Sequence, residues 1–186
     1  MAPCAFGGFL GSSLLVENQC SSPAYDGRME QTHDDQAGLR RILQRCKTIA
    51  VVGLSAEWHR PSYFAASYMQ GKGYRILPVN PRYAGGTVLG MPCVARLEDI
   101  TEPIHLVDVF RKTDDVGPIA ASAIALGAWC FWQQLGVVNL QADAAARAAG
   151  LASVVNRCVK IEHARLFGGL HWAGVNTGVI SARRAA

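Results

Sequence analysis

The sequence predicts a doubly wound α/β domain, with a parallel sheet of about five strands and helices on both faces. From about Thr48 to Phe167, short apolar runs alternate with stretches of helix-forming composition, a pattern typical of parallel strands joined by crossover helices. Of the 186 residues, 50% are hydrophobic and only 17% are charged, which suits a sheet that is covered on both sides. The length is sufficient for one sizeable core.

The first expected element is a helix that leads into the sheet. Asp34 or Asp35 is suited to cap this helix, because a side-chain oxygen at that position accepts a hydrogen bond from a free backbone amide. Four apolar residues then recur on one helical face. They are Leu39, Ile42, Leu43 and Cys46.

Five buried strands are expected next, because short apolar runs are bounded there by glycine, proline and polar residues. These strands span residues 49–53, 74–79, 104–110, 128–133 and 152–155. Helices are expected over residues 61–70, 114–126 and 140–149, and a glycine follows each one as a C-terminal cap. Residues 80–101 are expected to hold a loop, a short extra strand near Val88 and a turn of helix at Leu97.

The two ends of the chain differ from this pattern. Residues 1–36 are expected to form a flexible extension, since they contain Gly, Ser and Pro, a single Lys or Arg and no sustained period. Residues 168–186 are expected to be a tail. The apolar residues 5–16 have no basic residue before them and no clear cleavage site after them, so we expect a cytoplasmic protein. No apolar run approaches the roughly 18 residues of a membrane span, and we expect no membrane partner.

Composition argues against several classes of function. The net charge of +4 is small and scattered along the chain, so we expect no nucleic-acid partner, whereas a small anionic ligand is easily accommodated. The six cysteines include no Cys-x-x-Cys pair and have no histidine at metal-binding spacing. We therefore expect neither a disulfide framework nor a metal site.

The loop after the first strand is the first candidate ligand site, because ligands bind beyond the carboxyl ends of the strands in an open parallel sheet. This loop runs from Gly53 into a helix that starts at Pro61, and it brings Ser55, Arg60 and Ser62 to the helix start. Free amides at a helix start attract phosphate, and the hydroxyl and guanidinium groups would add donors. The alternative is an ordinary loop with a capping serine. The loop carries neither G-x-G-x-x-G nor G-x-S-x-G, and the sequence has no Walker motif.

The second candidate site follows the second strand, at Asn80, Pro81 and Arg82. An NAD site would need an acid there to hold the ribose hydroxyls, whereas Arg82 favours an extra phosphate on the ribose. NADP carries that phosphate at the 2′ position and coenzyme A at the 3′ position, so the charge alone does not separate these ligands. The alternative is a solvent-facing arginine in an Asn-Pro turn.

Further candidates lie at the ends of the next strands. Phe110 is suited to line an adenine slot, with Arg111 near its phosphates, although core packing is the more common role of such an aromatic residue. Gln133 and Gln134 are suited to hydrogen-bond an amide or a base edge. We interpret Cys158, after the last strand, as a buried apolar group rather than a reactive thiolate.

Six short blocks of sequence occur in a recognisable order: residues 49–55 (IAVVGLS), 60–62 (RPS), 78–81 (PVNP), 107–111 (VDVFR), 132–136 (WQQLG) and 157–163 (RCVKIEH). Together they resemble the stand-alone bacterial CoA-binding domain proteins, which are similar to the CoA-binding domain of the succinyl-CoA synthetase α subunit. The resemblance covers about residues 39–166. Residues 176–181 (NTGVIS) resemble the terminal segment of the same family.

This resemblance implies a Rossmann-like, CoA-binding domain over residues 37–167, in which the loop 53–62 meets the phosphates of coenzyme A. It implies that Asn80, Pro81 and Arg82 flank the adenosine 3′-phosphate. The remaining groove would be lined by Phe110, Arg111, Gln133 and Gln134. The chain lacks the second domain of the synthetase, with its phosphorylated histidine, so the ligase reaction is not implied.

We therefore expect a module that binds a CoA-type nucleotide, either coenzyme A or an acyl-CoA, and has no complete catalytic constellation. One alternative is an NADP-dependent oxidoreductase, although little chain is left to build a nicotinamide pocket. The other is a structural or interaction domain with a vestigial nucleotide site. A homo-oligomer and a protein partner are both left open.

Overall fold

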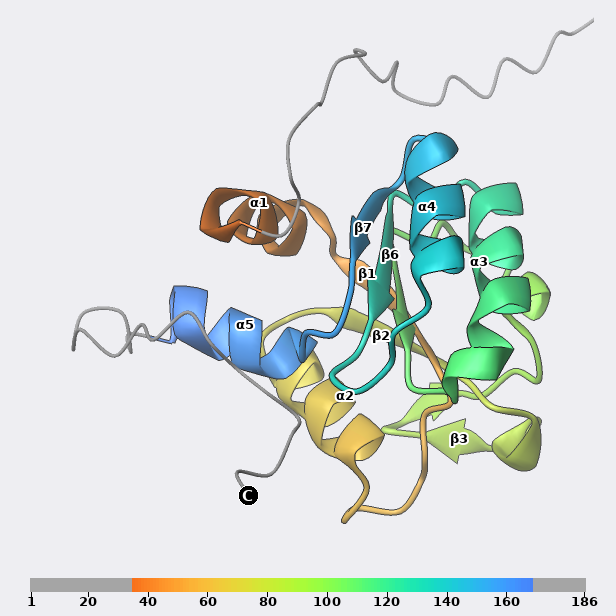
Figure 1. The fold of residues 1–186 in the computed structure, drawn as a ribbon. Helices are drawn as coiled ribbons and strands as arrows, with labels where there is room; N and C mark the ends of the chain where they lie inside the picture. Colours follow the sequence, from red (N-terminus) through yellow and green to blue (C-terminus); the bar gives the residue numbers. More distant parts are fainter. Residues whose placement is uncertain (1–34, 169–186) are drawn as a thin grey trace, which may run out of the picture. The chain divides into compact units, whose positions relative to one another are not determined.

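Five parallel strands form the centre of the computed structural model, which describes residues 35–168. The strands are β1 (Thr48–Val52), β2 (Arg75–Val79), β5 (Leu106–Val109), β6 (Cys130–Gln133) and β7 (Ala152–Val154). Their order in the sheet is β2-β1-β5-β6-β7, so the chain runs outward from β1 in one direction and then from β5 in the other. Helices lie on both sides of the sheet (Figure 1). This arrangement confirms the predicted doubly wound α/β fold.

Alternate residues of each strand enter two separate cores, one on each face of the sheet. In β1, Ile49 and Val51 pack with α1 (Gln36–Arg45), α2 (Pro61–Gly71) and α5 (Val159–Phe167). Ala50 and Val52 pack on the other face with α3 (Val116–Ala125) and α4 (Leu140–Ala148). Because successive side chains of a strand point to opposite faces, strands covered on both sides are almost continuously apolar.

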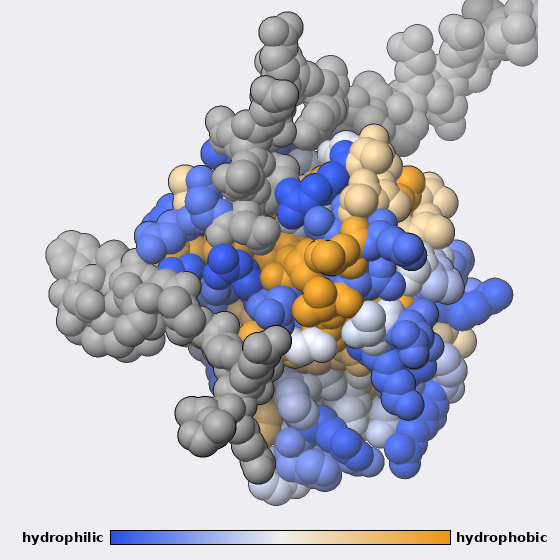
Figure 2. Space-filling model, in the orientation of Figure 1, coloured by the Kyte–Doolittle hydropathy of each residue, from blue (hydrophilic) through white to orange (hydrophobic). Residues whose placement is uncertain are grey.

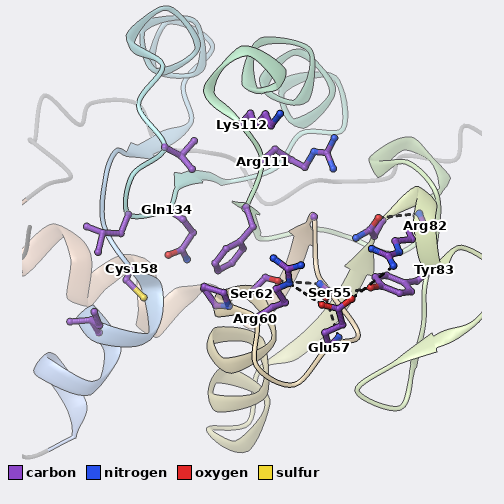
Figure 3. Close-up of a pocket in the computed structure, with 17 residues that line it drawn as sticks. Ser55, Glu57, Arg60, Ser62, Arg82, Tyr83, Arg111, Lys112, Gln134 and Cys158 are labelled. Atoms are coloured by element: carbon purple, nitrogen blue, oxygen red, sulfur yellow. Dashed lines mark hydrogen bonds and ion pairs between the residues drawn. The ribbon is translucent and has the colours of Figure 1, made fainter. Parts of the chain in front are cut away.

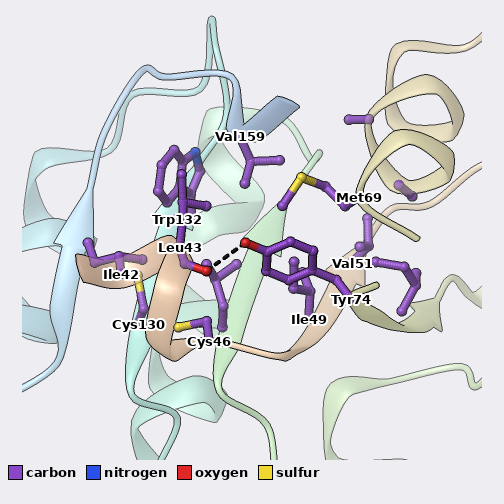
Figure 4. Packing of buried hydrophobic residues seen from close by; sticks show 14 of the residues in the cluster. Ile42, Leu43, Cys46, Ile49, Val51, Met69, Tyr74, Cys130, Trp132 and Val159 are labelled. Atoms are coloured by element: carbon purple, nitrogen blue, oxygen red, sulfur yellow. Dashed lines mark hydrogen bonds between the residues drawn. The ribbon is translucent and has the colours of Figure 1, made fainter. Parts of the chain in front are cut away.

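The core that contains α1 is closed by large side chains from distant parts of the chain (Figure 4). Trp132 of β6 is fully buried beside Leu43 of α1. The Tyr74 hydroxyl, which is also buried, donates a hydrogen bond of 2.6 Å to the Leu43 carbonyl oxygen. This bond satisfies the one polar atom of Tyr74 and joins the end of α1 to the start of β2.

The predicted elements before and between the strands are present, with small shifts at their ends. Asp35, one of the two expected caps, accepts a 2.6 Å hydrogen bond from the Gly38 amide, and Gln36 already belongs to α1 rather than to the extension. The extra strand expected near Val88 is one arm of a hairpin, β3 (Thr87–Val88) with β4 (Met91–Pro92). Single helical turns occur at Pro81–Tyr83, Leu97–Asp99 and Thr113–Asp115.

The helix α5 was not expected from the sequence, because much of its inward face is polar. Its buried residues include Glu162 and Arg165 as well as Val159 and Leu166. The Glu162 carboxylate accepts hydrogen bonds from Arg165 of the same helix and from Arg157, whose Nη1 lies 3.1 Å from Glu162 Oε1. The Trp132 indole N–H donates to the Arg157 carbonyl oxygen at 2.6 Å, and this bond ties the loop before α5 to β6.

The surface of the described part of the chain is mixed in polarity. Figure 2 shows apolar residues gathered in the middle of one face, with hydrophilic residues around them. Among residues 35–168, no helix is long and apolar enough to cross a membrane. The predicted extension up to residue 34, the tail from residue 169 and residues 176–181 lie outside the described residues.

Candidate functional site

A cavity of about 780 Å³ lies at the carboxyl ends of β1, β2, β5 and β6, and the start of α5 forms one of its walls (Figure 3). It brings together nine of the eleven residues expected to bind a ligand. They are Gly53, Ser55, Arg60, Ser62, Asn80, Arg82, Phe110, Arg111 and Gln134. Pro81 and Gln133 do not line this cavity.

Gly53 allows the loop after β1 to pass close to the end of β5. Its φ angle of +88° lies in the left-handed region, and its amide donates a 2.8 Å hydrogen bond to the Val79 carbonyl oxygen. A Cβ atom at this position would lie 2.6 Å from the Phe110 carbonyl oxygen and 2.9 Å from Cδ of Arg111. Both the backbone angle and the close approach therefore require glycine.

The start of α2 lines the cavity with Pro61 and Ser62. Arg60 is the N-cap residue and its side chain makes no capping hydrogen bond, while Pro61 occupies the first helical position. The amides of the next two residues have no acceptor within the helix, as at any helix start. Ser62 Oγ accepts a 3.1 Å hydrogen bond from the Ser55 amide, so the Ser62 hydroxyl keeps its own proton to donate. Such a helix start favours an anion.

Glu57 is a residue of the site that the sequence reasoning missed, and it lies among three cationic or titratable groups. Its Oε2 is 2.9 Å from Nε of Arg60 and 3.4 Å from Nε2 of His59, and its Oε1 is 3.9 Å from Nη2 of Arg82. The hydrogen bond from Arg60 is the main cause that lowers the pKa of Glu57. The sequence carries no clear signal for this pair, because residues 57–60 lie in a turn before α2 and the i, i+3 rule for charged pairs applies to helices.

The hydroxyl groups of the loop form a second small network. Ser55 Oγ accepts a 3.1 Å hydrogen bond from the Glu57 amide and lies 3.4 Å from the hydroxyl of Tyr83. The side-chain amide of Asn80 donates a 2.8 Å hydrogen bond to the Leu54 carbonyl oxygen. These contacts join the loop after β1 to the turn after β2, so the two candidate phosphate-binding segments lie against each other.

Arg111 separates the main cavity from a smaller one of about 360 Å³, and Gly53 and Arg111 line both. The Arg111 guanidinium forms an ion pair with Asp115 at 3.1 Å and remains about half exposed. Pro81, which the resemblance associates with the adenosine end of a ligand, lines the smaller cavity. Lys112 adds another cation to the lining of the main cavity.

The two glutamines differ in position. Gln133 is fully buried, and its side-chain amide is bonded to the backbone of Asn139, with Nε2 to the carbonyl oxygen at 3.0 Å and Oε1 to the amide at 2.7 Å. Gln133 therefore positions the start of α4. Gln134 lines the cavity, but its Nε2 donates to both oxygens of the buried Asp108, at 2.8 and 3.0 Å. Burial raises the pKa of Asp108 to about 8.

The lining of the cavity also includes the apolar side chains of Leu135, Val137 and Ile161 and the thiol of Cys158. Burial raises the pKa of the Cys158 thiol, so this group stays protonated at neutral pH. In Figure 3, Cys158 lies on the side of the cavity away from Glu57 and Arg82. Among residues 35–168, no group of three or more His, Cys, Asp or Glu side chains is placed to hold a metal ion.

His163 does not line the cavity, although it lies on the same helix as Ile161. Its Nδ1 is 3.2 Å from the Tyr68 hydroxyl, and its ring packs edge-to-face against Tyr68 and Tyr74. Burial lowers the pKa of His163. This aromatic cluster gives the histidine a packing role.

Comparison with known proteins identifies similar chains that share this region. A family model described as a CoA binding domain matches residues 47–164, from the start of β1 into α5. The uncharacterized protein YneT of Bacillus subtilis is 38% identical over 129 residues, which are 69% of this chain and 94% of that protein.

Two solved structures are similar to this chain at about the same level of sequence identity. One, from Thermus thermophilus, is 37% identical with a TM-score of 0.69, and the match covers 72% of this chain and 99% of that one. A hypothetical protein from Pyrococcus horikoshii is 36% identical with a TM-score of 0.70, and the match covers 76% of this chain and all of that one. Residues 47–164, which the family model matches, contain the whole sheet and all the residues that line the main cavity.

Proposed function

The chain belongs to the family of CoA binding domains, and on this premise we propose that its main cavity binds coenzyme A or an acyl-CoA without catalysing a reaction of its own. The observation that carries this proposal is the convergence of three arginines from three different segments on one cavity. Arg60 precedes α2, Arg82 follows β2 and Arg111 follows β5, and all three line the cavity. Coenzyme A carries three phosphate groups, which suit three guanidinium groups.

The start of α2 is the best candidate for the pyrophosphate. Its amides, the Ser62 hydroxyl and the Arg60 guanidinium lie at the same edge of the cavity, and backbone amides at a helix start combine with such donors to hold phosphate. Arg82 stands where the ribose phosphate is expected after the second strand.

The apolar part of the cavity lining is suited to the pantetheine arm. That arm is uncharged, and Leu135, Val137 and Ile161 offer it apolar contacts. A ligand whose phosphates lie at Arg60 and Arg82 would extend its sulfur end toward Cys158, which lies away from these arginines in Figure 3. A cavity of about 780 Å³ is within the usual range for a ligand of this kind.

The side chains present support binding rather than catalysis. The described residues that line the cavity include no histidine, and the pKa of Cys158 is raised rather than lowered. A catalytic thiol requires the opposite environment, with an adjacent base or a lowered pKa. These features support the proposal of a module that binds the nucleotide without transforming it.

Calorimetric titration of the full chain with coenzyme A, acetyl-CoA, NADP and NAD tests the proposal. We expect binding of the two thiol nucleotides and no comparable binding of NADP or NAD. Tighter binding of NADP than of coenzyme A would favour an oxidoreductase. The absence of a heat signal and of a thermal shift with all four ligands would contradict a nucleotide site.

The contact assigned to Arg82 is tested by Arg82→Ala. Loss of a charge-assisted hydrogen bond to the 3′-phosphate should weaken coenzyme A binding about tenfold and dephospho-CoA binding less than about twofold. Arg75→Ala removes the same charge from an exposed pair with Glu102 that lines neither cavity, and should leave both affinities unchanged. Equal losses for the two ligands in Arg82→Ala would refute the assigned contact.

A further inference from the structure

Glu57 is the one carboxylate among the described residues that line the main cavity. It lies between two of the arginines on which phosphate binding is proposed to depend: Oε2 contacts Arg60 at 2.9 Å, and Oε1 lies 3.9 Å from Arg82 (Figure 3). His59 approaches Oε2 at 3.4 Å. A single acidic side chain thus contacts one cation from the loop before α2 and one from the turn after β2.

These contacts use the same atoms that a phosphate would use. A distance of 2.9 Å between a guanidinium nitrogen and a carboxylate oxygen is typical of a charge-assisted hydrogen bond, and a phosphate oxygen binds a guanidinium at a similar distance. A ligand phosphate at Arg60 must either replace the Glu57 carboxylate or lie beside its negative charge. Both situations reduce the affinity for the anion.

We propose that Glu57 is an internal competitor for the phosphate-binding arginines and thereby sets the affinity that an anion needs to occupy the cavity. This inference rests on the proposed function. A competitor that belongs to the same chain is present at a high effective concentration. A small anion that contacts one arginine displaces it poorly, whereas a nucleotide that contacts Arg60, Arg82 and the amides of α2 together displaces it well. Glu57 therefore raises the concentration at which common small anions occupy the cavity.

The side chain of Glu57 is free to leave its position. About a third of its surface is exposed, and the loop that carries it is held through the backbone, because the Glu57 amide donates to Ser55 Oγ. Movement of the carboxylate into solvent would leave this loop contact in place. If Glu57 instead served to hold Arg60 and Arg82 in position, its removal would lower the affinity for the ligand. The two roles therefore predict opposite effects of a substitution at Glu57.

The test compares Glu57→Gln with the unaltered chain in titrations with coenzyme A and with inorganic phosphate. At low ionic strength we expect Glu57→Gln to bind coenzyme A about three- to fivefold more tightly, and to bind inorganic phosphate, titrated alone, more tightly by a similar factor. The gain should shrink toward unity at 0.5 M salt, because salt screens the exposed charges.

Glu102→Gln is the matched control, because it makes the same change in net charge. Glu102 pairs with Arg75 at 2.5 Å, and neither residue lines the cavity. We expect its affinities for both probes to remain those of the unaltered chain. An equal gain in both variants would indicate a general effect of charge and overturn the inference.

An unchanged or weaker affinity of Glu57→Gln for coenzyme A, in a chain that binds coenzyme A before the substitution, would overturn the role of Glu57 and leave the proposed function intact. The absence of coenzyme A binding in the unaltered chain and in both variants would instead overturn the proposed function. The two failures are therefore distinguishable in one set of titrations.

Discussion

Replacement of Gly53 by alanine should destabilise the protein through two separate effects. An L-residue at a φ of +88° carries a backbone strain of roughly 1–2 kcal/mol. The added methyl group would also meet the Phe110 carbonyl oxygen at 2.6 Å. That carbonyl belongs to a segment held by the 2.9 Å hydrogen bond from the Phe110 amide to the Val52 carbonyl oxygen, so it cannot move without disturbing the edge between β1 and β5.

The size of the steric effect follows from the overlap between the added methyl group and the Phe110 carbonyl oxygen. Insertion of a methyl group into a packed region costs roughly 1–3 kcal/mol, which gives a total of about 2–5 kcal/mol for Gly53→Ala. Gly73 is a matched control, because its φ is also +88° and no heavy atom lies within 4 Å of a Cβ built on it. Gly73→Ala should therefore lower the stability only by the backbone strain, about 1–2 kcal/mol.

Thermal and urea unfolding of the two variants measure the difference. With a shift of roughly 3 °C per kcal/mol for a domain of this size, Gly53→Ala should lower Tm by roughly 6–15 °C and Gly73→Ala by roughly 3–6 °C. Equal shifts would refute the reasoning, because they would show that the approach of the loop to β5 carries no penalty.

Two other substitutions test the buried carboxyl groups. Because burial raises the pKa of Asp108 to about 8 while an unfolded aspartate titrates near 4, the folded state holds an extra proton between these values, and stability should fall as pH rises from 5 to 8. Asp108→Asn should remove this slope in urea unfolding measured against pH, and a slope that persists would assign it to other groups. Glu162→Gln should destabilise the protein by about 3 kcal/mol, because it removes the carboxylate partner of the buried Arg165. Glu102 belongs to an exposed pair, so Glu102→Gln should lower the free energy of unfolding by less than about 1 kcal/mol in urea titration. Similar losses of stability in Glu162→Gln and Glu102→Gln would contradict a special role for burial.

The sheet could be predicted from the sequence because its strands are buried on both faces and are therefore apolar throughout. The run around Val51 and the run around Val107 show this plainly. The helix α5 could not be predicted in the same way, since Glu162 and Arg165 occupy its buried face and hide the apolar period. The ion pair that allows these residues to be buried depends on Arg157 as well, and such a contact is not visible in local spacing.

The residues of the candidate site could also be predicted only in part. The positions of Arg60, Arg82 and Arg111 followed from the rule that ligands bind beyond the carboxyl ends of parallel strands, and all three line the cavity. The rule does not say which of two adjacent residues turns inward. Gln133 ends the strand and is bonded to the start of α4, whereas Gln134 borders the cavity.

The buried ion pair of α5 also determines how this helix is rotated about its own axis. Arg157 is anchored to β6 through Trp132 and holds Glu162, so the helix cannot turn by one residue, about 100°, without breaking that contact. A wholly apolar inner face would slide more easily, since apolar contacts are not directional. The orientation that results turns Ile161 toward the cavity, while Lys160 lies over the rings of Phe64 and Tyr68. The ion pair of Glu162 with the partly exposed Arg157 thus helps to keep Ile161, rather than Lys160, in the wall of the cavity.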